Sequence, residues 1–146
     1  MHYTLIYPVR RVGTHNEVLL GYMLSGTWTG YFNGFGGKIG MLETPAAAAI
    51  RELHEEAGIL VELSQITYRG NVVFIEPDGD PREILVDVFT TIVDRHTIPK
   101  NTDDAIPCWF HSEHLPMRVM PPFDKYFINM IGMYRISDAP YLSSAD

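Results

Sequence analysis

The chain contains five β-rich runs, which are separated by turn signals and by two segments with helical spacing. They cover residues 3–12, 17–24, 71–76, 83–93 and 106–110. Residues 13–16, Gly-Thr-His-Asn, are typical of a hairpin turn between the first two runs. Residues 77–80, Pro-Asp-Gly-Asp, form a similar turn signal between the next two. The pattern therefore predicts five strands, four of which form two pairs that are each joined by a short turn.

Two helices are predicted. Thr44 is a good N-cap, Pro45 suits the first helical position, and Gly58 suits the residue just past the end. Apolar residues fall on one face of this helix at Ala46, Ala49, Ile50, Leu53 and Ala57. The second helix shows the same amphipathic spacing at Phe123, Tyr126, Phe127, Met130 and Ile131. Strands, a helix, more strands and a closing helix favour an α+β fold built as an α/β/α sandwich.

Three glutamates on the first helix are candidates for metal binding. Glu52, Glu55 and Glu56 are spaced i, i+3, i+4, which places them within an arc of about 100°. We expect them to project away from the core, where their mutual repulsion favours a divalent cation. Oxygen ligands suit Mg²⁺ or Mn²⁺. A solvated acidic face is the alternative interpretation. Before this helix, residues 26–40 hold six glycines and are predicted to be a loop whose backbone approaches a ligand.

Composition narrows the class of protein. The chain has 146 residues, 11 Lys and Arg against 18 Asp and Glu, and a formal net charge of −7. This acidity argues against sequence-independent binding to duplex nucleic acid, which needs a basic face. Its single cysteine, Cys108, fits a reducing compartment. We find no apolar run of about 20 residues for a membrane span and no secretory signal pattern. We therefore expect a cytoplasmic protein with one domain over residues 1–134 and a loose tail over 135–146.

The glutamates lie within a longer motif. Gly37 is followed after five residues by Glu43, and after seven more by the run Arg-Glu-Leu-His-Glu-Glu-Ala-Gly-Ile at residues 51–59. This run resembles the Nudix box, G-x5-E-x7-R-E-U-x-E-E-x-G-U with U aliphatic, at every defined position. Arg51 is placed to hold Glu43 through a bidentate ion pair. Gly37, Glu43 and Arg51 are therefore expected to support the site.

The resemblance extends across most of residues 3–131 and is strongest to MutT-type hydrolases of oxidised purine nucleoside triphosphates. It implies a Nudix α/β/α sandwich with a mixed central sheet, and Mg²⁺-dependent cleavage of a nucleoside triphosphate to the monophosphate and pyrophosphate by attack of metal-activated water. Metal ligands implied by the match are Glu52, Glu55, Glu56 and the carbonyl of Gly36. Asp104 matches a further acid that serves as a ligand or base. Implied substrate contacts are Thr4, Asn33, Lys38, Phe74 and Asp124.

The base pocket departs from the family pattern. The pair of aspartates that reads the base in these relatives is matched by Phe123 and Asp124, and a stacking tryptophan is replaced by Pro121. Asp124 also fits a first-turn acid favoured by the helix dipole, and Phe74 equally fits a core aromatic. The substrate is therefore either a purine nucleoside triphosphate, such as 8-oxo-dGTP, or another nucleoside diphosphate derivative, such as a dinucleotide polyphosphate or nucleotide sugar. A non-catalytic nucleotide-binding module is the third hypothesis. A monomer or a homodimer is expected.

Overall fold

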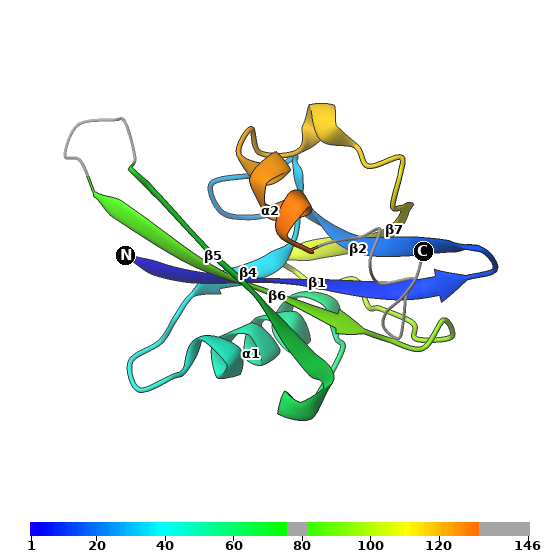
Figure 1. The fold of residues 1–146 in the computed structure, drawn as a ribbon, viewed down its shortest axis with the longest axis horizontal. Coiled ribbons are helices and arrows are strands. Elements are labelled where there is room, and N and C mark those ends of the chain that lie inside the picture. Colours follow the sequence, from blue (N-terminus) through cyan, green and yellow to red (C-terminus); the bar gives the residue numbers. More distant parts are fainter. Residues whose placement is uncertain (76–81, 132–146) are drawn as a thin grey trace.

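A computed structural model describes residues 1–75 and 82–131. Within these residues seven strands form one mixed sheet (Figure 1). The strands are β1 (His2–Val12), β2 (His15–Met23), β3 (Phe32–Asn33), β4 (Phe35–Lys38), β5 (Ile66–Ile75), β6 (Glu83–Ile92) and β7 (Ala105–His111). Their order is β3-β2-β1-β6-β5, with β4 paired to β1 and β7 paired to β2. The central strand β1 runs parallel to β6 and antiparallel to β2 and β4.

The two helices lie on opposite faces of this sheet. Helix α1 (Pro45–Ala57) covers one face and α2 (Asp124–Ile131) covers the other (Figure 1). Each helix packs over its own cluster of buried apolar side chains, one containing Leu53 of α1 and the other Phe127 of α2. Two short 3₁₀ turns, η1 (Leu63–Gln65) and η2 (Met117–Val119), lie in the connections. The predicted α/β/α sandwich with a mixed sheet is therefore confirmed.

The ends of α1 are fixed as the sequence predicts. The Thr44 hydroxyl accepts a hydrogen bond from the backbone N–H of Ala47 at 3.1 Å, which satisfies one free donor of the first turn. At the other end Gly58 adopts a left-handed conformation with φ of 67°, and its N–H donates to the His54 carbonyl at 3.0 Å. These caps set which residues of α1 face the sheet.

Two sequence predictions are corrected. The segment 26–40, predicted as loop, contains β3 and β4. These strands are very short and form by pairing with distant residues of β2 and β1, so local sequence does not reveal them. Strand β5 begins at Ile66 rather than residue 71, because a bulge between Tyr68 and Gly70 interrupts its pattern. The predicted turn at 77–80 and tail at 135–146 lie outside the described residues.

Replacement of Leu53 tests the packing of α1 on the sheet. This side chain is fully buried, so Leu53→Ala should lower the free energy of unfolding by about 2–5 kcal/mol, through lost burial and the cavity left behind. Denaturant unfolding measures the change. Leu60→Ala is the matched control, because Leu60 is 74% exposed and should change the stability by less than about 0.5 kcal/mol. Equal effects of the two substitutions would contradict the packing described.

Candidate active site

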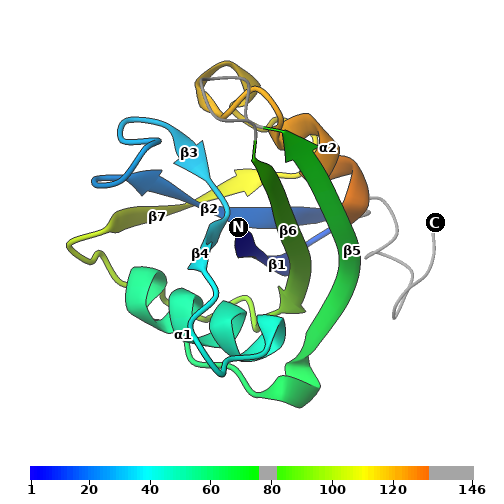
Figure 2. The same ribbon diagram turned by 90° about the vertical axis from the view of Figure 1, so that its left-hand side faces the viewer.

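Strand β4 lies beside α1 (Figure 2). Its two glycines bring the backbone against two carboxylates of the helix. The Gly36 N–H donates a hydrogen bond to Glu56 Oε1 at 3.0 Å. A Cβ atom at Gly37 would collide with the carboxylate of Glu52, and one at Gly36 would collide with the carbonyl oxygen of Thr4. Glycine is therefore required for β4 to pair with β1 and also reach the helix.

The glutamates are not equally exposed. Glu55 is exposed, but Glu56 is partly buried, and the Glu52 side chain is only 13% exposed. Our expectation that all three project away from the core is thus wrong for two of them. At about 100° per residue, Glu56 falls close to the buried Ala49 on the helical wheel, so it borders the apolar face. The site lies at this boundary, between the helix and β4.

Arg51 bonds to three glutamates of the motif, Glu43, Glu52 and Glu55. Its Nε and Nη2 donate to the two carboxylate oxygens of Glu43 at 2.7 and 2.9 Å, which is the predicted bidentate pair. Its Nη1 lies 3.1 Å from Glu52 Oε2 and 3.2 Å from Glu55 Oε1. The Arg51 hydrogen bonds, helped by one from the Gly40 N–H, lower the pKa of Glu43 to about 2. Glu43 is therefore a fixed negative charge that orients the arginine.

Burial and mutual repulsion raise the pKa of the two inner carboxylates, which favours their protonated forms. Burial, with the charges of Glu52, Asp104 and Glu55, raises the pKa of Glu56 to about 8, although the Gly36 hydrogen bond opposes this. Burial also raises the pKa of Glu52, while Arg51 opposes the shift. A positive charge bound here would replace those protons.

Asp104 belongs to the same electrostatic site. It is exposed on the loop before β7, and its charge contributes to the raised pKa of both Glu52 and Glu56. Ser25 donates a hydrogen bond to Asp104 Oδ1 at 3.2 Å, and the Thr102 hydroxyl donates to the Glu56 carbonyl oxygen at 2.9 Å. Ser25 and Thr102 tie this loop to β2 and α1. Neither residue is marked by a sequence motif, because only the tertiary fold brings Ser25 and Thr102 to the site.

The donor chemistry fits a hard divalent cation. Glu52, Glu55 and Glu56 offer only oxygen atoms, which Mg²⁺ and Mn²⁺ prefer. Across residues 1–75 and 82–131, however, no three acidic, His or Cys side chains are already arranged as a ligand set. Glu55 is instead paired with Arg51, and would have to leave it to join the other two. The three glutamates therefore fit a hard divalent cation in their chemistry, but Glu55 is held by the positive charge of Arg51.

The residues predicted to contact substrate are spread over both faces of the sheet. Thr4 is fully buried and, by strand alternation, lies on the same face of β1 as Ile6, under α1. Asp124 is fully buried at the start of α2, on the opposite face. The structure therefore does not place Thr4 beside Asp124.

The remaining predicted contacts have different surroundings. Lys38 is exposed at the end of β4, directly after the two glycines. Asn33 is partly buried, and its Oδ1 accepts a hydrogen bond from the Gly34 N–H at 2.8 Å, which leaves its NH₂ group as a donor. Phe74 lies in β5 opposite Ile84, and its side chain is outside what the structure describes.

Asp124 is electrostatically unusual. Neither carboxylate oxygen has a hydrogen-bond partner among the described residues, and burial raises its pKa to about 7. The preceding residue, Phe123, is partly exposed and meets Trp28 edge-on at 5.6 Å between ring centroids. A buried, unpaired carboxylate beside aromatic rings is suited to a planar polar ligand.

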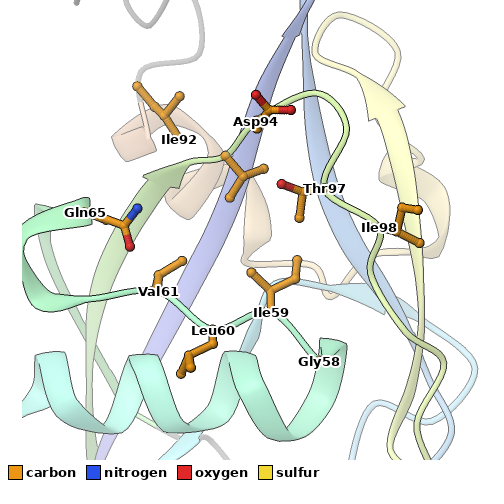
Figure 3. Close-up of a pocket in the computed structure, with 10 residues that line it drawn as sticks. Gly58, Ile59, Leu60, Val61, Gln65, Ile92, Asp94, Thr97 and Ile98 are labelled. Carbon is orange, nitrogen blue, oxygen red and sulfur yellow. The ribbon is translucent and has the colours of Figure 1, made fainter.

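One pocket lies away from all these groups. It has a volume of about 310 Å³ beyond the C-terminal end of α1 (Figure 3). Its walls are residues 58–61, Gln65, Ile92, Val93, Asp94, Thr97 and Ile98. None of the predicted site residues lines it, so it is not the proposed catalytic site.

Comparison with known proteins identifies the family. The NUDIX domain family matches residues 5–130, so the chain belongs to the Nudix family and is a Nudix hydrolase. It is 33% identical over 127 residues to the oxidized purine nucleoside triphosphate hydrolase of Mus musculus, covering 86% of this chain and 78% of that protein. The Danio rerio protein of the same name is 39% identical over 106 residues, 71% of this chain and 64% of that protein.

Solved structures confirm the fold. The MutT NUDIX hydrolase from Burkholderia pseudomallei superposes with a TM-score of 0.69 at 20% identity, covering 90% of this chain and 98% of that one. No helix in the described parts of the chain is long and apolar enough to cross a membrane.

The raised pKa of Glu56 predicts a pH-dependent stability. Without metal, the folded protein retains a proton up to about pH 8, whereas the unfolded chain releases it near the ordinary value of 4.5. Raising the pH between these values should therefore destabilise the wild type. Glu56→Gln removes this titration and keeps an acceptor for Gly36. The Tm of Glu56→Gln minus that of wild type should grow from about pH 5 to about pH 8 in EDTA. Glu113→Gln, at an exposed loop residue, is the control, and a pH-independent difference would contradict the assignment.

Proposed function

We propose that this Nudix hydrolase is a Mg²⁺-dependent pyrophosphohydrolase that converts a purine nucleoside triphosphate to the monophosphate and pyrophosphate. The observation that carries the proposal is the half-buried pair Glu52 and Glu56, held against Gly36 and Gly37 and backed by Arg51. Partly buried carboxylates with raised pKa values favour the binding of a further cation. The complete Nudix motif supports the same conclusion.

The residues have distinct proposed roles. Glu52, Glu55 and Glu56, with the Gly36 carbonyl, would hold Mg²⁺, which would supply positive charge to the reaction. Burial raises the pKa of Glu56 to about 8, so Glu56 is the first candidate to accept a proton, at Oε2, and exposed Asp104 is the second. Lys38, beyond the glycines, offers a positive charge to phosphate. Arg51 and Glu43 orient the helix carboxylates rather than react.

The preference for a purine rests on the α2 face and on the relatives. Two relatives named oxidized purine nucleoside triphosphate hydrolase match most of this chain. Asp124 is a buried carboxylate that can pair with a base edge, and the Asn33 amide retains its donor group. Trp28 and Phe123 offer aromatic rings beside it. An oxidised purine such as 8-oxo-dGTP is the favoured substrate.

Substitution of the metal-binding carboxylates tests the mechanism. Glu55→Gln and Glu56→Gln should each lower kcat by at least about 10²-fold, because loss of one ligand weakens both metal binding and charge stabilisation. Pyrophosphate release in the presence of Mg²⁺ measures the change, and circular dichroism checks the fold. Glu113→Gln should keep wild-type activity. Near-normal turnover in both site variants would refute the proposed centre.

A substrate screen separates this proposal from the two alternatives. Release of pyrophosphate from 8-oxo-dGTP and dGTP should exceed hydrolysis of a diadenosine polyphosphate and of ADP-sugars at equal concentration. Greater activity on a dinucleotide or nucleotide sugar would assign the enzyme to that substrate class instead. Nucleotide binding with no hydrolysis of any compound would favour a binding module.

A further inference from the structure

Tyr7 is a second buried polar group without a partner on the α2 face of the sheet. It lies on β1, is fully buried, and packs in the same cluster as Phe127 of α2. Its hydroxyl has no hydrogen-bond partner among the described residues, as is also true of both Asp124 oxygens. Unpaired buried polar atoms destabilise a folded protein, so each one in a native structure calls for an explanation. Two such groups in one region indicate a ligand that completes their hydrogen bonds.

The charge of Asp124 acts on the Tyr7 hydroxyl. Burial, together with the charge of Asp124, raises the pKa of the Tyr7 hydroxyl well above its ordinary value. The phenol is therefore a neutral O–H donor, and Asp124 in its ionised form is an acceptor. Tyr7 comes from β1 and Asp124 from α2, so the donor and the acceptor are held by separate, well-packed elements.

The connection between β3 and β4 also borders the region around Tyr7. The Tyr7 ring packs against Gly34, where an added Cβ atom would lie 2.6 Å from its Cε1 atom. Gly34 follows Asn33, whose NH₂ group remains a donor. The ring of Phe123, next to Asp124, is partly exposed. The Tyr7 hydroxyl and the Asp124 carboxylate thus lie in a region that the β3–β4 connection and Phe123 also border, an arrangement suited to the edge of a planar heterocycle.

We propose that Tyr7 is a specificity-determining residue, whose hydroxyl donates a hydrogen bond to the base while Asp124 accepts one from the neighbouring ring N–H. This pair matches the lactam edge of a 6-oxopurine, in which a carbonyl oxygen adjoins an N–H group. A 6-aminopurine presents the opposite order, with a donor at the exocyclic position. The inference rests on the proposed function and extends it, because it assigns the second polar contact with the base to β1.

Replacement of Tyr7 with phenylalanine tests the inference. Tyr7→Phe keeps the ring and removes only the hydroxyl. It should lower kcat/KM for dITP and 8-oxo-dGTP by about 10-fold relative to dATP and 8-oxo-dATP, because one acceptor of the 6-oxopurine loses its donor. The Tm should rise, since an unpaired buried hydroxyl is gone. Tyr126→Phe is the matched control, because Tyr126 lies on α2 with 55% exposure and should change neither quantity.

The outcomes distinguish this inference from the proposed function. A higher Tm with an unchanged ratio of 6-oxo to 6-amino substrates would overturn the role of Tyr7 and leave the hydrolase proposal intact. If the wild type hydrolyses no purine triphosphate, the proposed function fails. The inference about Tyr7 is then tested by measuring the affinities for dGMP and dAMP by calorimetry. Weaker dGMP binding by Tyr7→Phe, with unchanged dAMP binding, would then support the inference. Equal dGMP affinity in both proteins, or no dGMP binding by the wild type, would overturn it.

Discussion

The close approach of β4 to α1 is the constraint on which the rest of the site depends. Gly36 and Gly37 have no side chains, so the strand comes near enough for a backbone N–H to hold Glu56 and for Glu52 to pack alongside. The strand is itself fixed by antiparallel pairing with β1 at the centre of the sheet. The positions of the carboxylates are therefore set by the sheet as much as by their own helix, which gives the site a rigid base.

The sequence predicted features determined by nearby residues. The caps of α1, its apolar face and the Arg51–Glu43 pair follow from spacing within one segment, and all are confirmed. Strands β3 and β4 were missed because they depend on pairing partners far away in the chain. The start of β5 was misplaced because Gly70, with φ of 125°, lies at a bulge that breaks the alternation of side chains.

In the candidate site too, features set by nearby residues could be predicted from the sequence, and features set by tertiary contacts could not. Spacing made the three helix glutamates candidates and the match to the Nudix motif assigned them as metal ligands, but neither revealed that Glu52 and Glu56 are partly buried. That depends on β4 covering them. Tyr7 was not singled out because a tyrosine in a β-rich run resembles any core aromatic. Only the folded structure, in which β1 and α2 contribute to one apolar cluster, shows that the Tyr7 hydroxyl and Asp124 both lack hydrogen-bond partners among the described residues on this face of the sheet.

Arg51 bonds to Glu43, Glu52 and Glu55 at once. One permanent cation therefore already compensates much of the negative charge gathered on α1, whereas small zinc domains cannot fold until their ion arrives. A divalent ion bound by all three glutamates would require Glu55 to leave this arginine. Metal binding would then be an exchange of one counter-ion of Glu55 for another.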